Sequence, residues 1–203
     1  MARTGPVTKA ANTVPIGLAK VLVSTDWETH FETRGQALDD INDTLGALNS
    51  SSFDSEIDFW RLESGFPAME DKVVPLRERA SFSLEFKEVH PRNMALARGA
   101  DFSTLDSTLS GEISLGNVTE PRYVRAEAIY TYPNGSNKMS FIFPRAQVTS
   151  TANIAFAAED NPNVPVTIES KRADSEVQAV QDSDTITDKE FWSDAPLGII
   201  KFS

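Results

Sequence analysis

The fold can be predicted from residues 80–99, which read Ala-Ser-Phe-Ser-Leu-Glu-Phe-Lys-Glu-Val-His-Pro-Arg-Asn-Met-Ala-Leu-Ala-Arg-Gly. In the first half of this stretch, Phe82, Leu84 and Phe86 alternate with Ser, Glu and Lys. Alternation with a period of two is typical of a strand that has one buried face and one wet face. We therefore expect a strand whose polar side faces water, on an outer surface or in a bore.

The second half of the stretch predicts a short helix. Pro91 suits the first helical turn because its missing N–H is not needed there. Gly99 suits the position just after a helix, where the backbone often turns left-handed. A helix of this length is unstable alone in water, so it must dock on apolar neighbours. Met94 and Leu96 are the candidate docking residues.

Composition limits the possible classes of protein. With 203 residues, 40% of them hydrophobic, the chain can form one domain with a substantial core, and we take residues 1–203 as a single β domain. A net charge of −11 argues against a phosphate-binding groove. The absence of cysteine excludes disulfides and thiol chemistry. No stretch is long and apolar enough to span a bilayer, so we expect no membrane insertion.

Two segments near the N-terminus differ from the rest of the chain. Residues 1–15 are small and polar and predict an N-terminal arm, and residues 26–55 form an acidic insertion or loop. Four apolar residues inside the acidic segment are spaced as one face of a helix: Leu38, Ile41, Leu45 and Leu48. A solvated acidic loop is an equally acceptable interpretation.

Most of the remaining chain predicts short strands separated by turn residues. The apolar or alternating runs are 16–24, 57–60, 73–87, 122–131, 138–143, 154–156, 164–171 and 197–202. Asn134-Gly135, between two alternating runs, is a strong hairpin signal. Many short strands with one short helix predict an antiparallel β-sandwich or barrel.

Catalytic and metal-binding patterns are weak. His30 and His90 lie in different segments without an evident partner, and no nucleophile elbow, phosphate loop or zinc motif is present. Residues 182–187 begin like a calcium loop, but Thr187 occupies the position that needs glycine. We therefore predict no catalytic residue, no cofactor and no metal, and a protein that is not an enzyme.

Several stretches, taken together and in order, resemble the bacteriophage tail tube proteins. They are Glu63-Ser64-Gly65-Phe66-Pro67, the run from Glu85 to Gly99, Phe141-Ile142-Phe143-Pro144-Arg145-Ala146, Val164-Pro165-Val166-Thr167-Ile168 and Trp192-Ser193-Asp194-Ala195-Pro196-Leu197-Gly198. The likeness covers roughly residues 56–203, and the acidic segment 26–55 has no counterpart in it.

This resemblance implies a structural subunit of a virion tail, made in the cytoplasm of a bacterial host. Subunits of that family form rings of six, joined as one ring-shaped β-barrel, and the rings stack into a tube. Double-stranded DNA passes through the tube without specific binding, and the partners would be further copies and other tail proteins (tape measure, terminator, baseplate or tip). The candidate lumen-facing residues are polar positions on alternating strands: Ser81, Ser83, Glu85, Glu127 and Glu169. Residues 4–14 and 26–55 would be ordered mainly by neighbouring subunits.

Two other functions are compatible with the sequence. A tube of a related contractile injection or secretion machine would share the fold and the ring but carry protein or no cargo. A soluble β-sandwich binding module, for carbohydrate or a partner protein, belongs to another class. A monomer at high concentration would favour the binding module.

Overall fold

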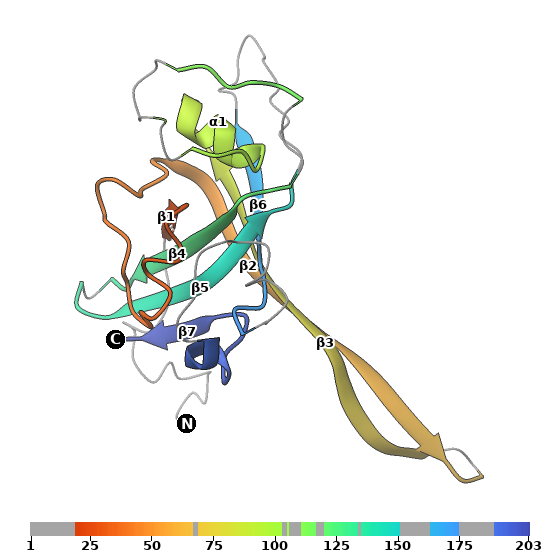
Figure 1. The fold of residues 1–203 in the computed structure, drawn as a ribbon. Coiled ribbons are helices and arrows are strands. Elements are labelled where there is room, and N and C mark those ends of the chain that lie inside the picture. Colours follow the sequence, from red (N-terminus) through yellow and green to blue (C-terminus); the bar gives the residue numbers. More distant parts are fainter. Residues whose placement is uncertain are drawn as a thin grey trace, which may run out of the picture.

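The computed structural model describes residues 19–66, 69–102, 105, 111–116, 120–133, 135–150, 163–174 and 189–203. These residues form an antiparallel seven-stranded sheet with one short α-helix (Figure 1). The elements are β1 (Lys20–Ser24), β2 (Leu48–Ser64), β3 (Met69–Phe86), α1 (Pro91–Ala97), β4 (Tyr123–Thr131), β5 (Lys138–Val148), β6 (Val164–Ser170), the 3₁₀ turn η3 (Lys189–Trp192) and β7 (Ile199–Phe202). The prediction of a mainly β fold with a short flanking helix is confirmed, and the strands of the described residues do not close into a barrel within one chain.

The strand order determines which edges of the sheet are covered. It runs β1-β4-β5-β6-β3-β2, and β7 pairs with β5 over residues 139–142, next to the stretch where β6 pairs with β5. The outer edge of β1 is bonded by the chain that follows it, through Val23 N–H to Asp43 O at 2.9 Å and Leu45 N–H to Val21 O at 3.3 Å. Among the described residues, no strand pairs with the outer edge of β2. Within the described part of the chain, the edge at β1 is therefore covered, whereas no strand pairs with the outer edge of β2 or of β7.

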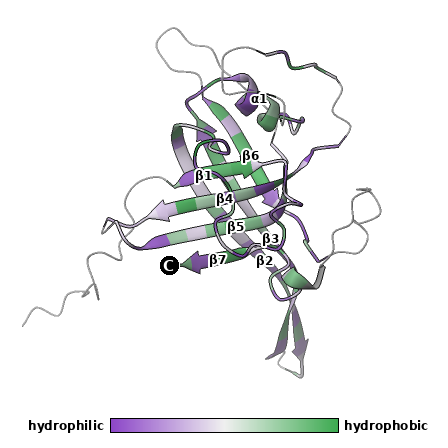
Figure 2. Ribbon diagram, turned by 60° about the vertical axis from the view of Figure 1, so that its left-hand side comes forward, coloured by the Kyte–Doolittle hydropathy of each residue, from purple (hydrophilic) through white to green (hydrophobic). Residues whose placement is uncertain are grey.

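The sheet curls around an aromatic core. Phe53 on the edge strand β2 lies 4.7 Å, between ring centroids, from Phe141 on the central strand β5. Phe82 stacks on Phe143 at 4.2 Å. Because β3 and β6 lie between β2 and β5, contact between Phe53 and Phe141 requires strong curvature, as twisted sheets readily adopt. Figure 2 shows hydrophobic residues along the strands of the curled sheet.

The alternation read at residues 80–86 is confirmed, because Phe82, Leu84 and Phe86 are buried on the core side. The helix α1 covers one end of this core. Pro91 occupies its first turn, and Gly99 follows it with φ of +65°. Leu96 is fully buried in the core, and Met94 is partly buried against it.

The opposite face of β1, β4 and β5 is covered by two irregular segments, residues 26–45 and 191–198. Trp27 and Phe31 from the first segment pack with Ile142 and Trp192 in a second apolar cluster. The indole Nε1–H of Trp192 donates to Phe31 O at 2.6 Å, so the two segments hold each other. The sheet is therefore buried on both faces in this half of the molecule.

The helix considered for residues 38–48 is wrong. These residues form turns and irregular chain, and Leu48 begins β2, so the acidic segment ends in a long strand. Leu38 and Leu45 are buried, whereas Ile41 is 82% exposed, because the contacts come from a winding chain rather than from a helical face. The expectation that residues 26–55 depend on neighbouring subunits to bury apolar surface is also wrong for this part, since Trp27, Phe31, Leu38 and Leu45 are buried within the chain.

Three expectations fall outside the described residues. They concern the N-terminal arm 1–15, the strand over 154–156 and the acidic stretch that contains 182–187.

Candidate assembly interface

Strands β2 and β3 continue far beyond the sheet as a two-stranded arm (Figure 1). β6 accompanies β3 only from Phe86 to Ser81, so residues 56–66 and 69–79 have only each other for strand pairing among the described residues. We call these residues the arm. Its backbone is unpaired along both outer edges, and an isolated two-stranded ribbon is at best marginally stable in water.

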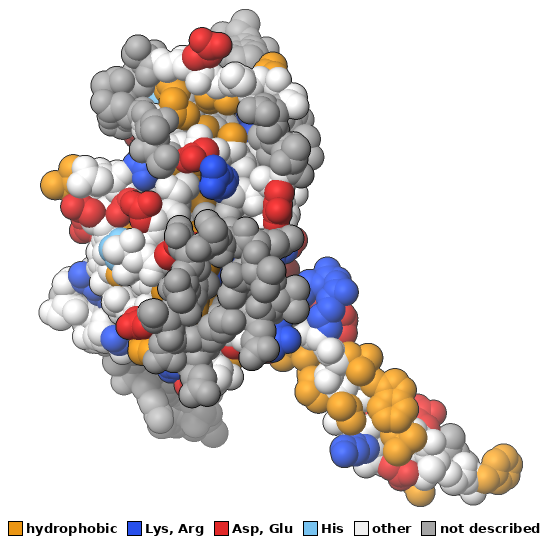
Figure 3. Space-filling view, viewed as in Figure 1, with side chains coloured by type: hydrophobic (Ala, Val, Ile, Leu, Met, Phe, Trp, Pro, Cys, Tyr) orange, Lys and Arg blue, Asp and Glu red, His pale blue; other side chains and the backbone are white. Residues whose placement is uncertain are grey.

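The arm carries a concentration of exposed apolar side chains. They are Ile57, Phe59, Trp60, Leu62, Phe66, Met69, Val73 and Leu76, each at least 40% exposed. Figure 3 shows the hydrophobic side chains gathered along the arm beyond its charged base. A concentration of exposed apolar side chains of this kind marks an interaction site.

The strand register places these side chains on both faces of the arm. Phe59 lies opposite Pro75 and Arg61 opposite Val73, so Ile57, Phe59 and Val73 share the face that continues the core side of the sheet. Trp60 lies opposite Val74 and Leu62 opposite Lys72, which places Trp60 and Leu62 on the other face. β3 has one extra, unpaired residue at Leu76 and another at Asp71. The faces are assigned from the paired residues on either side, so these two bulges do not change the assignment. The arm therefore has two apolar faces.

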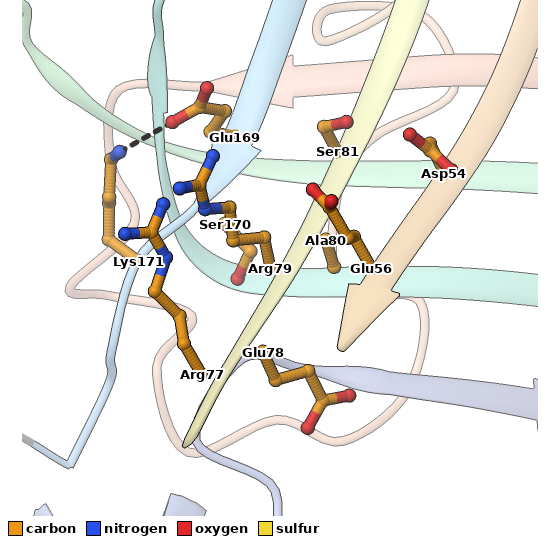
Figure 4. Close-up of a pocket in the computed structure, with 10 residues that line it drawn as sticks. All are labelled: Asp54, Glu56, Arg77, Glu78, Arg79, Ala80, Ser81, Glu169, Ser170 and Lys171. Atoms are coloured by element: carbon orange, nitrogen blue, oxygen red, sulfur yellow. Dashed lines mark hydrogen bonds and ion pairs between the residues drawn. The ribbon is translucent and has the colours of Figure 1, made fainter. Parts of the chain in front are cut away.

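A charged hollow lies at the base of the arm (Figure 4). It is lined by Asp54, Glu56, Arg77, Glu78, Arg79, Ala80, Ser81, Glu169, Ser170 and Lys171. Glu56 lies opposite Arg79 and Asp58 opposite Arg77, so acids on β2 face bases on β3. Arg77 Nε is 3.9 Å from Asp58 Oδ2, a loose and exposed pair that contributes little to stability. Both signs of charge are thus available at this surface for a partner.

Four of the five candidate lumen-facing residues lie on one face of two paired strands. Ser81 lies directly opposite Glu169, and Ser83 and Glu85 follow at every second position along β3. Ser83 is exposed, and the other three are half-buried. The described segments that cover β4 and β5 form apolar clusters there, and these clusters do not include Ser81, Ser83, Glu85 or Glu169. They form a polar strip on the sheet face opposite the core.

Glu169 is held as a carboxylate by its neighbours. A hydrogen bond from Lys171 Nζ, at 2.8 Å, lowers the pKa of Glu169, and the charges of Lys171 and Arg79 act in the same direction. Partial burial opposes them. Glu169 therefore keeps its negative charge to a lower pH than an unpaired glutamate would.

Glu127 does not belong to the polar strip, and the prediction of a wet position for it is wrong. It is fully buried beneath residues 30–37, where its carboxylate pairs with Arg125 Nε at 2.7 Å and accepts the Ala37 N–H at 3.1 Å. Burial lowers the pKa of Arg125, while Glu127 counteracts that shift. Arg125 also donates to Thr33 O at 2.8 Å and Gly35 O at 3.0 Å. This pair fastens the covering segment to β4.

The described residues show little that could support other chemistry. No group of three or more His, Cys, Asp and Glu side chains that could hold a metal ion occurs among them. Within the same residues, no helix is long and apolar enough to cross a membrane. His90 precedes α1, and burial lowers its pKa; it shares no site with His30.

Thirteen chains of solved structures are similar to this one, and they include the following two. One is the cap of the anti-feeding prophage, described as a tube terminating cap, with 17% identity, a TM-score of 0.46, and coverage of 85% of this chain and 96% of that one. The other is a chain of the sheath–tube complex of the extracellular contractile injection system PVC in its extended state, with 14% identity, a TM-score of 0.44, and coverage of 78% and 88%. No protein-family model matches the sequence, and no curated protein matches it.

Proposed function

We propose that this protein is a structural subunit of a tail tube: a chain that joins further copies in rings, which stack into a hollow conduit. The observation that carries the proposal is the arm, with at least 40% exposure at every one of its large apolar side chains named above. Burying such a side chain is worth about 1.5–3 kcal/mol, so an arm left in water would forgo a large stabilisation. In a repeating assembly, neighbouring copies can bury these side chains.

The open edge of β2 supports the same proposal. A free edge invites pairing with another strand, which proteins usually prevent by covering or charging it. The edge at β1 is bonded by residues 43–45 and cannot pair with the β2 edge of another copy, so a head-to-tail contact of β2 must use a different surface of that copy. Head-to-tail contacts generate rings when the rotation closes. The family resemblance of residues 56–203 adds the expectation of six subunits and of stacking.

The polar strip formed by Ser81, Ser83, Glu85 and Glu169 is the proposed wall of the bore. The hydroxyl groups and carboxylates of the strip offer DNA no ion pairs, and of the neighbouring bases Lys171 is bound to Glu169 and Arg79 lies opposite Glu56. Additional lysine or arginine would instead bind phosphates by releasing counterions. The bore would then conduct the genome without holding it. Other tail proteins would bind the ends of the tube, the particle would be a virion, and the subunit would have no catalytic role.

The same ring could serve an injection machine that moves protein, and the polar strip fits that cargo as well. A carbohydrate-binding module is disfavoured because its arm would keep two apolar faces in water.

Native mass spectrometry and negative-stain microscopy of concentrated protein test the proposal. Sixfold species, stacking into hollow tubes, are expected. A strict monomer at every concentration, including within an isolated particle, would refute it, and rings that never stack would refute the tube.

A further inference from the structure

Strand β3 has a free edge that begins where β6 leaves it. β6 pairs with β3 only as far as Ser81 and Glu169, and it continues beside β5, where Ser170 lies opposite Ala146. Beyond this fork, no described strand pairs with that side of β3. The charged hollow lies at the fork (Figure 4). Residues 77–80 therefore present a strand edge to the hollow, and such an edge is a template for a further strand.

The outer edge of β2 carries a row of acids. Asp54, Glu56 and Asp58 occupy alternate positions, and no base occurs on this strand before Arg61. Side chains at alternate positions share one face of a strand. Asp54 lies opposite Ser81, so the acids are on the same face as the polar strip. Within the described part of the chain, this edge has no strand bonded to it.

The two strands of the arm are complementary in charge at its base. Arg79 lies opposite Glu56 and Arg77 lies opposite Asp58, all on one face. Side chains stand nearly perpendicular to a sheet, so a strand shows the same pattern to a neighbour on either of its edges. The free edge of β3 therefore suits a second β2 strand as well as the other edge suits its own. Only another copy of the chain can supply that strand.

Charge favours this pairing over the symmetric ones. Two β2 edges brought together would place acid against acid, and two β3 edges would place Arg77 and Arg79 against the same bases. Like charges directly opposite one another destabilise a sheet. The acids near the β3 edge do not oppose a second β2 strand in the same way. Glu169 is bound by Lys171 Nζ at 2.8 Å, and Glu78 alternates with the arginines and so lies on the other face.

We propose that the free edge of β3 at the hollow binds the outer edge of β2 from a second copy of this chain. The two strands run antiparallel, with Glu56 and Asp58 of one copy beside Arg79 and Arg77 of the other. The inference rests on the proposed function, because it names the surface that receives β2 in the ring. Each copy offers one edge and receives another, so the contact is head-to-tail, and a closed ring leaves neither of these two edges free.

A charge exchange between two preparations tests the pairing. The first carries Asp54→Lys, Glu56→Lys and Asp58→Lys, and the second carries Arg77→Glu and Arg79→Glu. All five positions are exposed, so the body is expected to fold, as checked by circular dichroism. Each preparation alone places like charges at the contact, and its yield of rings is expected to fall about tenfold or more. An equimolar mixture restores opposite charges at every contact, so native mass spectrometry is expected to show rings in which the two chains alternate.

Rescue by mixing separates a contact between copies from an effect inside one chain. The charges within each hairpin are mismatched equally in the mixture and in the separate preparations, so an arm damaged by the substitutions would not recover. Given rings of the wild-type chain, normal assembly of either preparation alone, or a mixture without rings, would overturn the pairing and leave the tube proposal standing. Failure of the wild-type chain to assemble would overturn both.

Cross-linking distinguishes this pairing from contact between two β2 edges. Chains with Ile57→Cys are mixed with chains that carry Glu78→Cys, and each then has a single cysteine because the sequence contains none. After assembly, a short thiol-specific linker is expected to join the two different chains. The yield should be much lower when Leu115→Cys, at an exposed position outside the arm, replaces Glu78→Cys. Equal yields, or links mainly between two Ile57→Cys chains, would contradict the proposed pairing.

Discussion

Arg125 and Glu127 form a fully buried ion pair, with 2.7 Å between Nε and Oε1, on the face of β4 opposite the aromatic core. They are two residues apart, so their side chains leave the strand on the same side. Together they bind the backbone of residues 33–37 and fix the covering segment to the sheet. The pair has a structural role. It lies under the segment that covers β4, whereas the polar strip lies on β3 and β6.

Replacing Glu127 should therefore destabilise the monomer. Glu127→Ala leaves the Arg125 charge buried without its partner, and we expect the free energy of unfolding to fall by about 3–5 kcal/mol. Chemical denaturation measures it. Glu85→Ala, at a partly exposed carboxylate of the polar strip, is the matched control and should cost about 0.5 kcal/mol or less. Equal losses for the two variants would contradict the assignment of Glu127 to the interior.

The arm should matter for assembly and not for folding. The combined variant Phe59→Ser, Trp60→Ser and Leu62→Ser alters only exposed side chains, so each change should shift the free energy of unfolding by about 0.5 kcal/mol or less. Loss of rings or tubes is expected in size-exclusion chromatography with light scattering. Leu115→Ser, at a side chain that is 76% exposed outside the arm, should assemble normally. Normal assembly of the triple variant would show that the arm is dispensable.

Gly198 should tolerate no side chain. Its φ is +126°, and an added Cβ would lie 2.2 Å from the carbonyl oxygen of Ile142, a backbone atom of the central strand. Gly116, with φ of +85° and no atom within 4 Å of the added Cβ, is a control for backbone strain alone. We expect Gly116→Ala to cost about 1–2 kcal/mol and Gly198→Ala about 1–3 kcal/mol more. Thermal unfolding that ranks the two equally would argue against the close approach of β7 to β5.

Charge reversal on the polar strip should slow transport and spare assembly. Glu85→Lys combined with Glu169→Lys introduces phosphate-binding groups into the proposed bore, and the delay in DNA delivery should be greatest at low salt. The control variant carries Glu32→Lys and Glu112→Lys, at exposed positions outside the strip, with the same change in net charge. Wild-type delivery by the first variant, with intact tubes, would place the strip outside the bore.

The hydrogen bond from Lys171 to Glu169 predicts how the charge of Glu169 responds to pH. A carboxyl group whose pKa is lowered in the folded state stabilises that state above its ordinary pKa of 4.5 and loses this contribution as the pH falls through the folded value. Lys171→Met should raise the pKa of Glu169 towards 4.5, as followed by carboxyl-carbon NMR, and should narrow the pH range over which Glu169 stays charged. An unchanged titration would show that Lys171 does not hold Glu169.

The strands around residues 80–86 and 123–131, and the helix at 91–97, were predictable because local alternation, a proline and a glycine all favoured the same structure. The docking of residues 26–47 was not. Its apolar residues follow no helical or strand period, since they reach the sheet from turns whose shape depends on buried Arg125 and Glu127. A charged pair at alternate positions in an otherwise apolar strand was the available signal.

The arm was predictable only in part. A strand from Ile57, a turn at 63–67 and a strand from Val73 follow from the sequence, but nothing local indicates that the ribbon leaves the body. That depends on where β6 stops accompanying β3, which is a property of strand pairing across the whole sheet. The sequence correctly grouped Ser81, Ser83, Glu85 and Glu169 on a polar face but wrongly added the buried Glu127. Alternation reveals the two faces of a strand without revealing what covers each one.

Cryo-electron microscopy of the assembly formed by the unmodified chain tests the central claim most directly. We expect stacked sixfold rings around an open bore, with Glu85 and Glu169 facing the bore and each arm covered by other copies. A particle in which the arms remain in solvent, or in which these carboxylates lie on the outer surface, would contradict it.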